Sequence, residues 1–186
     1  MRTLPSLQAH RLSLMFVTAT LALCTRAERV FVGVLEADSY QGVIYGASAF
    51  SRIADLPLAL ELVNDALLKN LAVPALKGIS LTDTLRIVQT ADSTQPLSDE
   101  NPDNVAIIPL ADNGATVLET FSSAYASRSN KDPFQLFEHP KDNTNLAPRV
   151  VVAVTGHYLL ASRSRDALGW AWDNRTRLID APSQSL

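Results

Sequence analysis

Cysteine is nearly absent from this chain of 186 residues, which contains only Cys24. If a signal peptide ending at Ala27 is removed, for the reasons given below, the mature chain has no thiol. It then forms no disulfide, binds no metal through a thiolate and carries no cysteine nucleophile. The scarcity of cysteine therefore excludes disulfide-rich scaffolds and cysteine hydrolases as descriptions of the mature protein.

Histidine, glycine and clustered positive charge are also scarce. The chain has three histidines and seven glycines. Beyond residue 27 only His139 and His157 remain, in unlike sequence contexts, which argues against a histidine metal cluster. No glycine-rich phosphate loop follows any predicted strand, and the lysines and arginines form no basic patch of the kind that nucleic acid requires. We therefore expect no cofactor and no nucleic-acid partner.

The first 27 residues have the layout of a secretory signal peptide. Arg2 and Arg11 supply positive charge without any acid, residues 12–23 form an apolar or hydroxyl-bearing run, and Ala27 is a small residue at the expected cleavage position. This run is shorter than the roughly twenty residues that cross a bilayer as a helix. The pattern predicts export, cleavage near Ala27, and a secreted or periplasmic protein with no stable membrane span after cleavage.

Three alternatives to cleavage at Ala27 stay open: a retained anchor, an ordinary buried helix, and lipidation. Residues 21–24 partly resemble a lipobox, in which Cys24 would become the lipid-bearing first residue, but Leu23 stands where that pattern has a small residue. Cleavage at Ala27 removes three of the 16 basic residues and none of the 19 acidic ones, which leaves a net charge near −6. Such an acidic chain is not attracted to anionic lipid head groups.

Hydrophobic periodicity in residues 28–186 predicts alternating groups of strands and helices. Because several strands follow one another directly, the order favours an α+β fold with an antiparallel or mixed sheet and helices packed mainly on one face. The predicted strands are 29–35, 81–91, 105–110, 135–137, 150–154 and 157–161, with a turn at Thr155-Gly156. The first of them alternates regularly and is apolar on both faces, which predicts a buried strand. The predicted helices follow Ser39, span 58–72 with a stop marked by Pro74, follow Asp112 or Asn113, and follow Ser162 or Ser164. The third of these helices includes Tyr125 and leads into a polar exit over residues 127–133.

All residue types of a serine-hydrolase triad occur within ten positions near the C-terminus: His157, Ser162, Ser164 and Asp166. In such a triad a histidine accepts the proton of a serine, and a carboxylate orients the histidine. Closeness in sequence does not give this geometry, and Ser164 and Asp166 are better explained as the cap and the dipole partner of a helix start. We therefore assign no catalytic residue and keep a small serine-type hydrolase as the alternative function.

Residues 99–104 match the first half of a calcium-binding loop. Asp99, Asn101 and Asp103 offer oxygen ligands at alternate positions. The second half is missing, since Leu110 stands where the loop needs a bidentate glutamate. We therefore assign no metal ligand and expect a solvated polar loop, with a weakly calcium-binding envelope protein as a further alternative.

Residues 150–168 resemble a hairpin-and-helix signature of large exported bacterial proteins of unknown function. Val150 to Val154, the Gly156 turn and the returning strand are followed by a Ser-x-x-Ala-Leu helix start at Ser164. The resemblance covers mainly residues 105–172. It implies an exported α+β module, in proteins that usually continue into a second comparable half, and it carries no catalytic residues across to this chain.

The lead hypothesis for function is an exported, non-enzymatic binding or structural module of the cell envelope. We expect one α+β domain over residues 28–186, or an incomplete half of a two-unit protein. The strand predicted at 150–154 is apolar on both faces and needs cover on both, but few predicted helices are free to supply it. An exposed strand edge or apolar face would then favour pairing. The expected partner is a second copy of the chain or another envelope protein.

Overall fold

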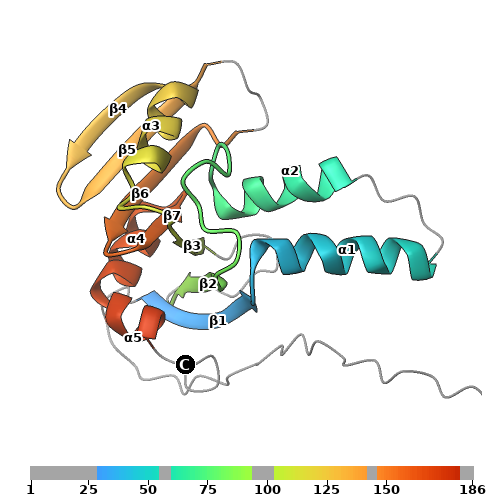
Figure 1. The fold of residues 1–186 in the computed structure, drawn as a ribbon. Coiled ribbons are helices and arrows are strands. Elements are labelled where there is room, and N and C mark those ends of the chain that lie inside the picture. Colours follow the sequence, from blue (N-terminus) through green and yellow to red (C-terminus); the bar gives the residue numbers. More distant parts are fainter. Residues whose placement is uncertain (1–28, 55–59, 94–102, 142–145, 181–186) are drawn as a thin grey trace, which may run out of the picture.

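The computed structural model describes residues 29–54, 60–93, 103–141 and 146–180. Within these ranges the chain forms seven strands and five helices (Figure 1). In chain order the elements are β1 (Arg29–Ala37), α1 (Tyr40–Ala54), α2 (Leu60–Leu71), β2 (Leu85–Asp92), β3 (Asp103–Pro109), α3 (Ala115–Ala124), β4 (Tyr125–Lys131), β5 (Phe134–Pro140), β6 (Arg149–Thr155), β7 (Tyr158–Ser162), α4 (Arg165–Asp173) and α5 (Arg175–Asp180).

The strands form one sheet in the spatial order β1-β2-β3-β7-β6-β5-β4. Every neighbouring pair is antiparallel. The predicted α+β class with an antiparallel sheet is therefore confirmed. The strands β1 and β4 form the two edges of the sheet, while β3 and β7 lie at its centre.

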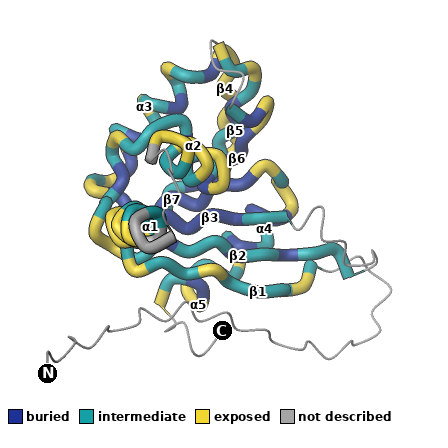
Figure 2. The backbone as a smooth tube through the Cα atoms, turned by 90° about the vertical axis from the view of Figure 1, so that its right-hand side faces the viewer, coloured by how far each residue is buried: buried dark blue, intermediate teal, exposed yellow. Residues whose placement is uncertain are grey.

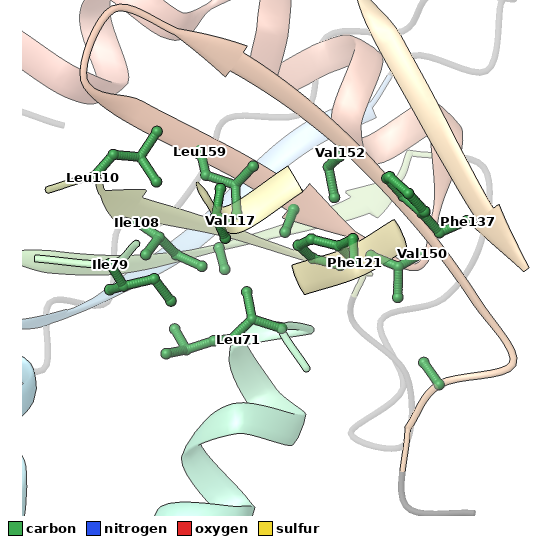
Figure 3. Packing of buried hydrophobic residues seen from close by; sticks show 14 of the residues in the cluster. Leu71, Ile79, Ile108, Leu110, Val117, Phe121, Phe137, Val150, Val152 and Leu159 are labelled. Atoms are coloured by element: carbon green, nitrogen blue, oxygen red, sulfur yellow. The ribbon is translucent and has the colours of Figure 1, made fainter. Parts of the chain in front are cut away.

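Helices cover both faces of the sheet, with the three longer ones on the same face. On that face Leu71 of α2 and Phe121 of α3 pack with strand residues such as Ile108 (Figure 3). On the opposite face Leu168 of α4 and Leu178 of α5 belong to a second buried cluster. We call the two sides the α1–α3 face and the α4–α5 face. Most helical residues lie on the first, as predicted.

The strand β6 is covered on both faces, which corrects the expectation that it would lack cover. Val150 and Val152 pack in the cluster of the α1–α3 face, whereas Val151 and Ala153 pack in the cluster of the α4–α5 face. The continuous apolar run therefore indicated burial on both sides correctly. The argument that cover was missing for this strand was wrong, because the predicted helix after Ser164, α4, and the unpredicted α5 together cover its second face.

The polar segment from Ser127 to Pro133 was expected to be the exit of a helix, and this was wrong. Most of it belongs to β4, and the short strand expected at 135–137 is the longer β5 that pairs with it. The residues of β4 after Tyr125 are all exposed. A strand with no buried face shows no apolar alternation, so hydrophobic periodicity does not detect it. The helix α5 was not predicted either.

Local side-chain bonds explain where two helices begin. Ser39 accepts a hydrogen bond at Oγ from the backbone N–H of Gly42 at 2.9 Å, which confirms it as the predicted cap of α1. Ser164 is the N-cap of α4, and its Oγ accepts from the N–H of Ala167 at 3.3 Å. Of the two alternatives for this helix, the structure therefore selects Ser164 rather than Ser162.

Asp112 stabilises the start of α3 without being its N-cap. Its Oδ1 accepts from the N–H of Gly114 at 2.7 Å and its Oδ2 from the N–H of Thr116 at 3.4 Å. Gly114 is the N-cap, and its φ of 90° suits glycine. The hydrogen bonds from the Thr116 side chain and the Gly114 backbone lower the pKa of Asp112.

The helix α2 ends through a left-handed residue that the sequence did not indicate. Ala72 has a φ of 55°, a conformation that glycine usually takes. The N–H of Ala72 donates to the carbonyl of Lys69 at 3.3 Å, and that of Val73 donates to Leu68 at 3.1 Å. This is the Schellman pattern. It ends α2 ahead of Pro74, where the sequence suggested the stop.

The helices α1 and α2 lie side by side and extend away from the sheet (Figure 1). Tyr40 of α1 donates a hydrogen bond from its hydroxyl to Oδ1 of Asn64 in α2. Burial raises the pKa of Tyr40, and the charge of Asp65 raises it further. Much of the outer surface of the two helices is exposed (Figure 2). Their exposed apolar residues include Tyr45 and Leu62.

Candidate functional site

The edge strand β1 exposes apolar side chains. In the described part of the chain it pairs only with β2, so no described strand covers its other side. Val30 is 37% exposed and Leu35 is 42% exposed. The sequence predicted a buried strand here, because both faces are apolar. The structure corrects this expectation and places the strand at an edge.

The opposite edge strand, β4, has the polar surface that edge strands usually carry. All its residues from Ala126 to Lys131 are exposed (Figure 2). Arg128 donates from Nη2 to Oε1 of Gln135 at 2.8 Å and from Nε to Oδ1 of Asn130 at 3.2 Å. Charged and hydrogen-bonded side chains of this kind hinder the addition of another strand.

A bulge at Val32 changes which side chains of β1 share a face. Phe31 pairs with Thr90 and Gly33 pairs with the preceding residue of β2, so Val32 has no partner. The strict alternation predicted for this strand was therefore wrong. Phe31 and Val34 both pack in the cluster of the α4–α5 face, although three positions separate them.

Two ion pairs fix the ends of β1 on the α4–α5 face. At one end Arg29 pairs with the carboxylate of Asp103 and donates from Nη2 to Oγ of Ser164 at 3.3 Å. At the other end Glu36 accepts from Nε of Arg86 at 2.8 Å. Because neighbouring residues of a strand point to opposite faces, Val30 and Leu35 point to the other face, the α1–α3 face.

Arg86 also ties β1 to the helix α5. Its Nη1 donates to the carbonyl oxygens of Leu178 and Ile179, at 3.0 Å and 2.7 Å. These carbonyls lie in the last turn of α5, where backbone acceptors have no partner within the helix. Arg86 is a residue of β2, so its guanidinium links this strand to Glu36 of β1 and to the C-terminal turn of α5.

A separate cleft lies at the C-terminal end of α2. It has an empty volume of about 500 Å³, part of which is open solvent. Its lining is mainly apolar, and Asp65 and Lys69 of α2 add charge. The lining residues are Asp65, Leu68, Lys69, Ala72, Val73, Pro74, Tyr125, Leu146, Ala147 and Val150.

Tyr125 forms part of the cleft wall and is held by a buried hydrogen bond. Its hydroxyl donates to the carbonyl of Ala147 at 3.0 Å. Burial raises the pKa of Tyr125, and the nearby positive charge of Arg163 acts in the opposite direction. Arg163 itself donates from Nη2 to the carbonyl of Lys69 at 3.1 Å. The sequence assigned Tyr125 to a helix and did not indicate the cleft.

The four candidate residues of a hydrolase do not converge in the structure. His157 is exposed in the turn before β7, whereas Ser162 and Ser164 lie at the far end of that strand. The turn consists of Gly156 and His157, one position later than predicted, and Gly156 takes a φ of 56°. At about 3.3 Å per residue, the five residues of β7 separate the histidine from the serines by roughly 16 Å.

The two serines have structural partners of their own. Ser162 is buried and donates from Oγ to the carbonyl of Asn104 at 2.7 Å, while accepting from the N–H of Ser164 at 3.1 Å. Ser164 caps α4, as described above, and Asp166 is exposed in the first turn of that helix. The arrangement supports the structural explanation of these residues.

The calcium-loop candidates are only partly described. Asp99 and Asn101 lie outside the described residues. Asp103 is the first residue of β3, and its carboxylate pairs with Arg29. Among the residues that the structure describes, no group of three or more metal-ligating side chains comes together. None of the described helices has the length and apolar character that a membrane crossing requires.

Comparison with known proteins gave no matching family model, no matching curated protein and no matching solved structure. The resemblance to large exported bacterial proteins therefore stays a prediction.

Proposed function

We propose that this chain is an exported, non-enzymatic binding or structural module of the cell envelope that acts by strand addition at β1. The observation that carries the proposal is the apolar edge of β1, which no described strand covers, in a sheet whose other edge is polar. Exposed edge strands bind extended segments through backbone hydrogen bonds, and side chains on alternate positions give specificity. We therefore expect the protein partner to be recognised through contacts with Val30 and Leu35.

Export is supported by the N-terminal sequence, in which Arg2 and Arg11 precede and flank an apolar run that ends before Ala27. The measurement is the intact mass of the protein isolated from its native host. We expect a mature chain that begins near Glu28. An N-terminus at Met1 or Thr3 would contradict export.

Strand addition is tested with two synthetic peptides, one with the sequence of Arg29–Ala37 and the other with that of Tyr125–Lys131. The readout is amide hydrogen exchange of the whole chain with each peptide in excess. We expect slow exchange along β1 when the first peptide is present and no added protection at β4 with the second. Exchange at β1 that stays as fast as at β4 under all conditions would overturn the proposal.

The cleft at the end of α2 favours a second candidate function, the binding of a small and mainly apolar molecule. Concave sites with apolar walls and a few polar groups are the usual form of ligand pockets. A suitable probe pair is hexanoate and hexanol, titrated while the nuclear magnetic resonance signals of Leu68, Val73 and Leu146 are followed. Saturable shifts that disappear in Leu68→Trp, which narrows the cleft, would support binding. Unchanged signals with both probes would exclude it.

A further inference from the structure

The sequence of β1 is complementary to itself when read in the two directions. It has a base near its start and an acid near its end, with exposed apolar residues just inside each. If two copies of β1 lie antiparallel with Arg29 opposite Glu36, then Val30 lies opposite Leu35. Phe31 then lies opposite Val34. Each of these pairs joins side chains of matching character.

The bulge is what allows this register. In a symmetric antiparallel pair, a twofold axis perpendicular to the sheet keeps every residue on its own face, so opposed residues must share a face. Arg29 and Glu36 are seven positions apart and would lie on opposite faces of a regular strand. The unpaired Val32 shifts the alternation by one, and both residues lie on the α4–α5 face.

The neighbouring register is much poorer. Moving the partner by one position places Val30 opposite Glu36, an apolar residue opposite an acid. The two also point to different faces of the sheet, so they make no side-chain pair. Of these two registers, the self-complementary pattern therefore favours the one with Arg29 opposite Glu36.

We propose that β1 pairs with β1 of a second copy of this chain, antiparallel and with Arg29 opposite Glu36, so that one sheet continues across both copies. This inference rests on the proposed function and names its partner. Each copy already holds the ion pairs Arg29–Asp103 and Arg86–Glu36. In the pair they come together as an alternating row of charges on one face, while Val30 and Leu35 cover each other on the opposite face.

The edge strand β4 does not offer the same possibility. It carries Arg128 and Lys131 and no acid. Any pairing of β4 with itself brings only positive charges together, which opposes association. The comparison assigns self-association to one edge of the sheet.

The test uses two double variants that differ only in the residue at position 35, expressed from the full sequence so that the host sets the mature N-terminus. Val30→Lys/Leu35→Glu places a lysine of each copy opposite a glutamate of the other. Val30→Lys/Leu35→Lys places lysines opposite each other twice. Dissociation constants are measured by light scattering and sedimentation over a range of concentrations. Thermal unfolding of both variants checks that they fold.

We expect a dimer for the parent chain and for Val30→Lys/Leu35→Glu. For Val30→Lys/Leu35→Lys we expect a dissociation constant larger by roughly tenfold or more than that of the complementary variant. Equal dissociation constants for the two variants would overturn the register. A parent chain that stays monomeric at all concentrations would overturn self-pairing.

The peptide experiment separates this failure from failure of the proposed function. A monomeric parent chain whose β1 amides are still protected by the β1 peptide would overturn the second copy as partner while supporting strand addition. A monomeric chain without such protection would overturn both.

Discussion

The strands β4 and β1 end the same sheet, but they meet the solvent in different ways. Along β4 every residue after Tyr125 is exposed, and the exposed side chains are mostly polar or charged. Along β1 the exposed residues are Val30 and Leu35, while its charged residues Arg29 and Glu36 are partly buried in ion pairs. The charges of β4 hinder another strand, whereas those of β1 are bound within the chain.

This difference shows that edge protection is a local property of each strand. An exposed apolar edge is an aggregation hazard unless something covers it. The chain protects β4 with Arg128 and Lys131 and leaves β1 apolar, although β1 has room for charge at both exposed positions. We therefore interpret the β1 edge as a surface for association.

The largest loss of stability is expected from a change in the core beneath the polar edge, because the first residue of β4 is buried there. The ring of Phe121 is fully buried, 5.1 Å from that of Phe137 and 6.2 Å from that of Tyr125 between ring centres. We expect Phe121→Ala to lower the free energy of unfolding by about 3–5 kcal/mol through lost contacts and a cavity. Urea denaturation measures this loss.

The matched variant at the other edge is Phe31→Ala. Phe31 is only partly buried against the α4–α5 face. We expect a smaller loss of about 1–2 kcal/mol, because less apolar surface leaves the core. Equal losses at the two positions would show that both edges depend on buried aromatic packing to the same extent.

The second-largest loss of stability is expected when the ion pair between Glu36 and Arg86 is broken. In Arg86→Ala, Glu36 loses its counterion, and the carbonyls of Leu178 and Ile179 lose their donor. We expect a loss of about 1–3 kcal/mol, with faster amide exchange in both β1 and α5. The control is Arg128→Ala on β4, whose exposed contacts predict a loss of about 1 kcal/mol or less. Faster exchange confined to β2 would contradict the role of Arg86 as a link.

Much of the fold could be predicted from the sequence, because buried elements carry a periodic apolar pattern. The strand β6 and the caps Ser39 and Ser164 were indicated by their residues. The pattern failed where burial is absent, at β4, whose polar residues resemble a loop. It also missed α5, a helix of six residues, in which too few turns exist to show a period.

The candidate site was harder to predict, since it depends on which strands become neighbours. An apolar strand such as β1 is typical of a sheet centre, and only the long-range pairing order places it at an edge. One signal was available. Gly33 lies within the strand, and a glycine there often marks a bulge. The cleft was not indicated, because its lining combines α2 with Tyr125 and the segment before β6.

The third-largest loss of stability is expected at Tyr125, where β4 begins. We expect Tyr125→Phe to cost about 1 kcal/mol, because the carbonyl of Ala147 loses its donor. Burial raises the pKa of this phenol above 10.0, so the unfolded chain loses the proton first. The stabilisation is complete below pH 10 and decreases as pH rises beyond it. Alkaline denaturation should therefore be less steep in Tyr125→Phe. An identical pH profile would contradict the assignment.

The smallest change in stability, with a clear change in association, is expected when β4 is made to resemble β1. Ser129→Val/Lys131→Val adds two β-branched apolar residues to exposed positions of this edge, and Ser129→Thr/Lys131→Thr has the same shape with hydroxyls. Both variants should unfold within about 0.5 kcal/mol of the parent, as exposed substitutions usually do. Both also lose the same charge, so a difference between them reports apolar character alone.

We expect the valine variant to form larger assemblies than the parent in light scattering, because a second open edge allows chains to join at both ends of the sheet. The threonine variant should keep the assembly state of the parent. If the valine variant does the same, an apolar edge is not enough for association in this fold, and the pairing of β1 must depend on its charge pattern.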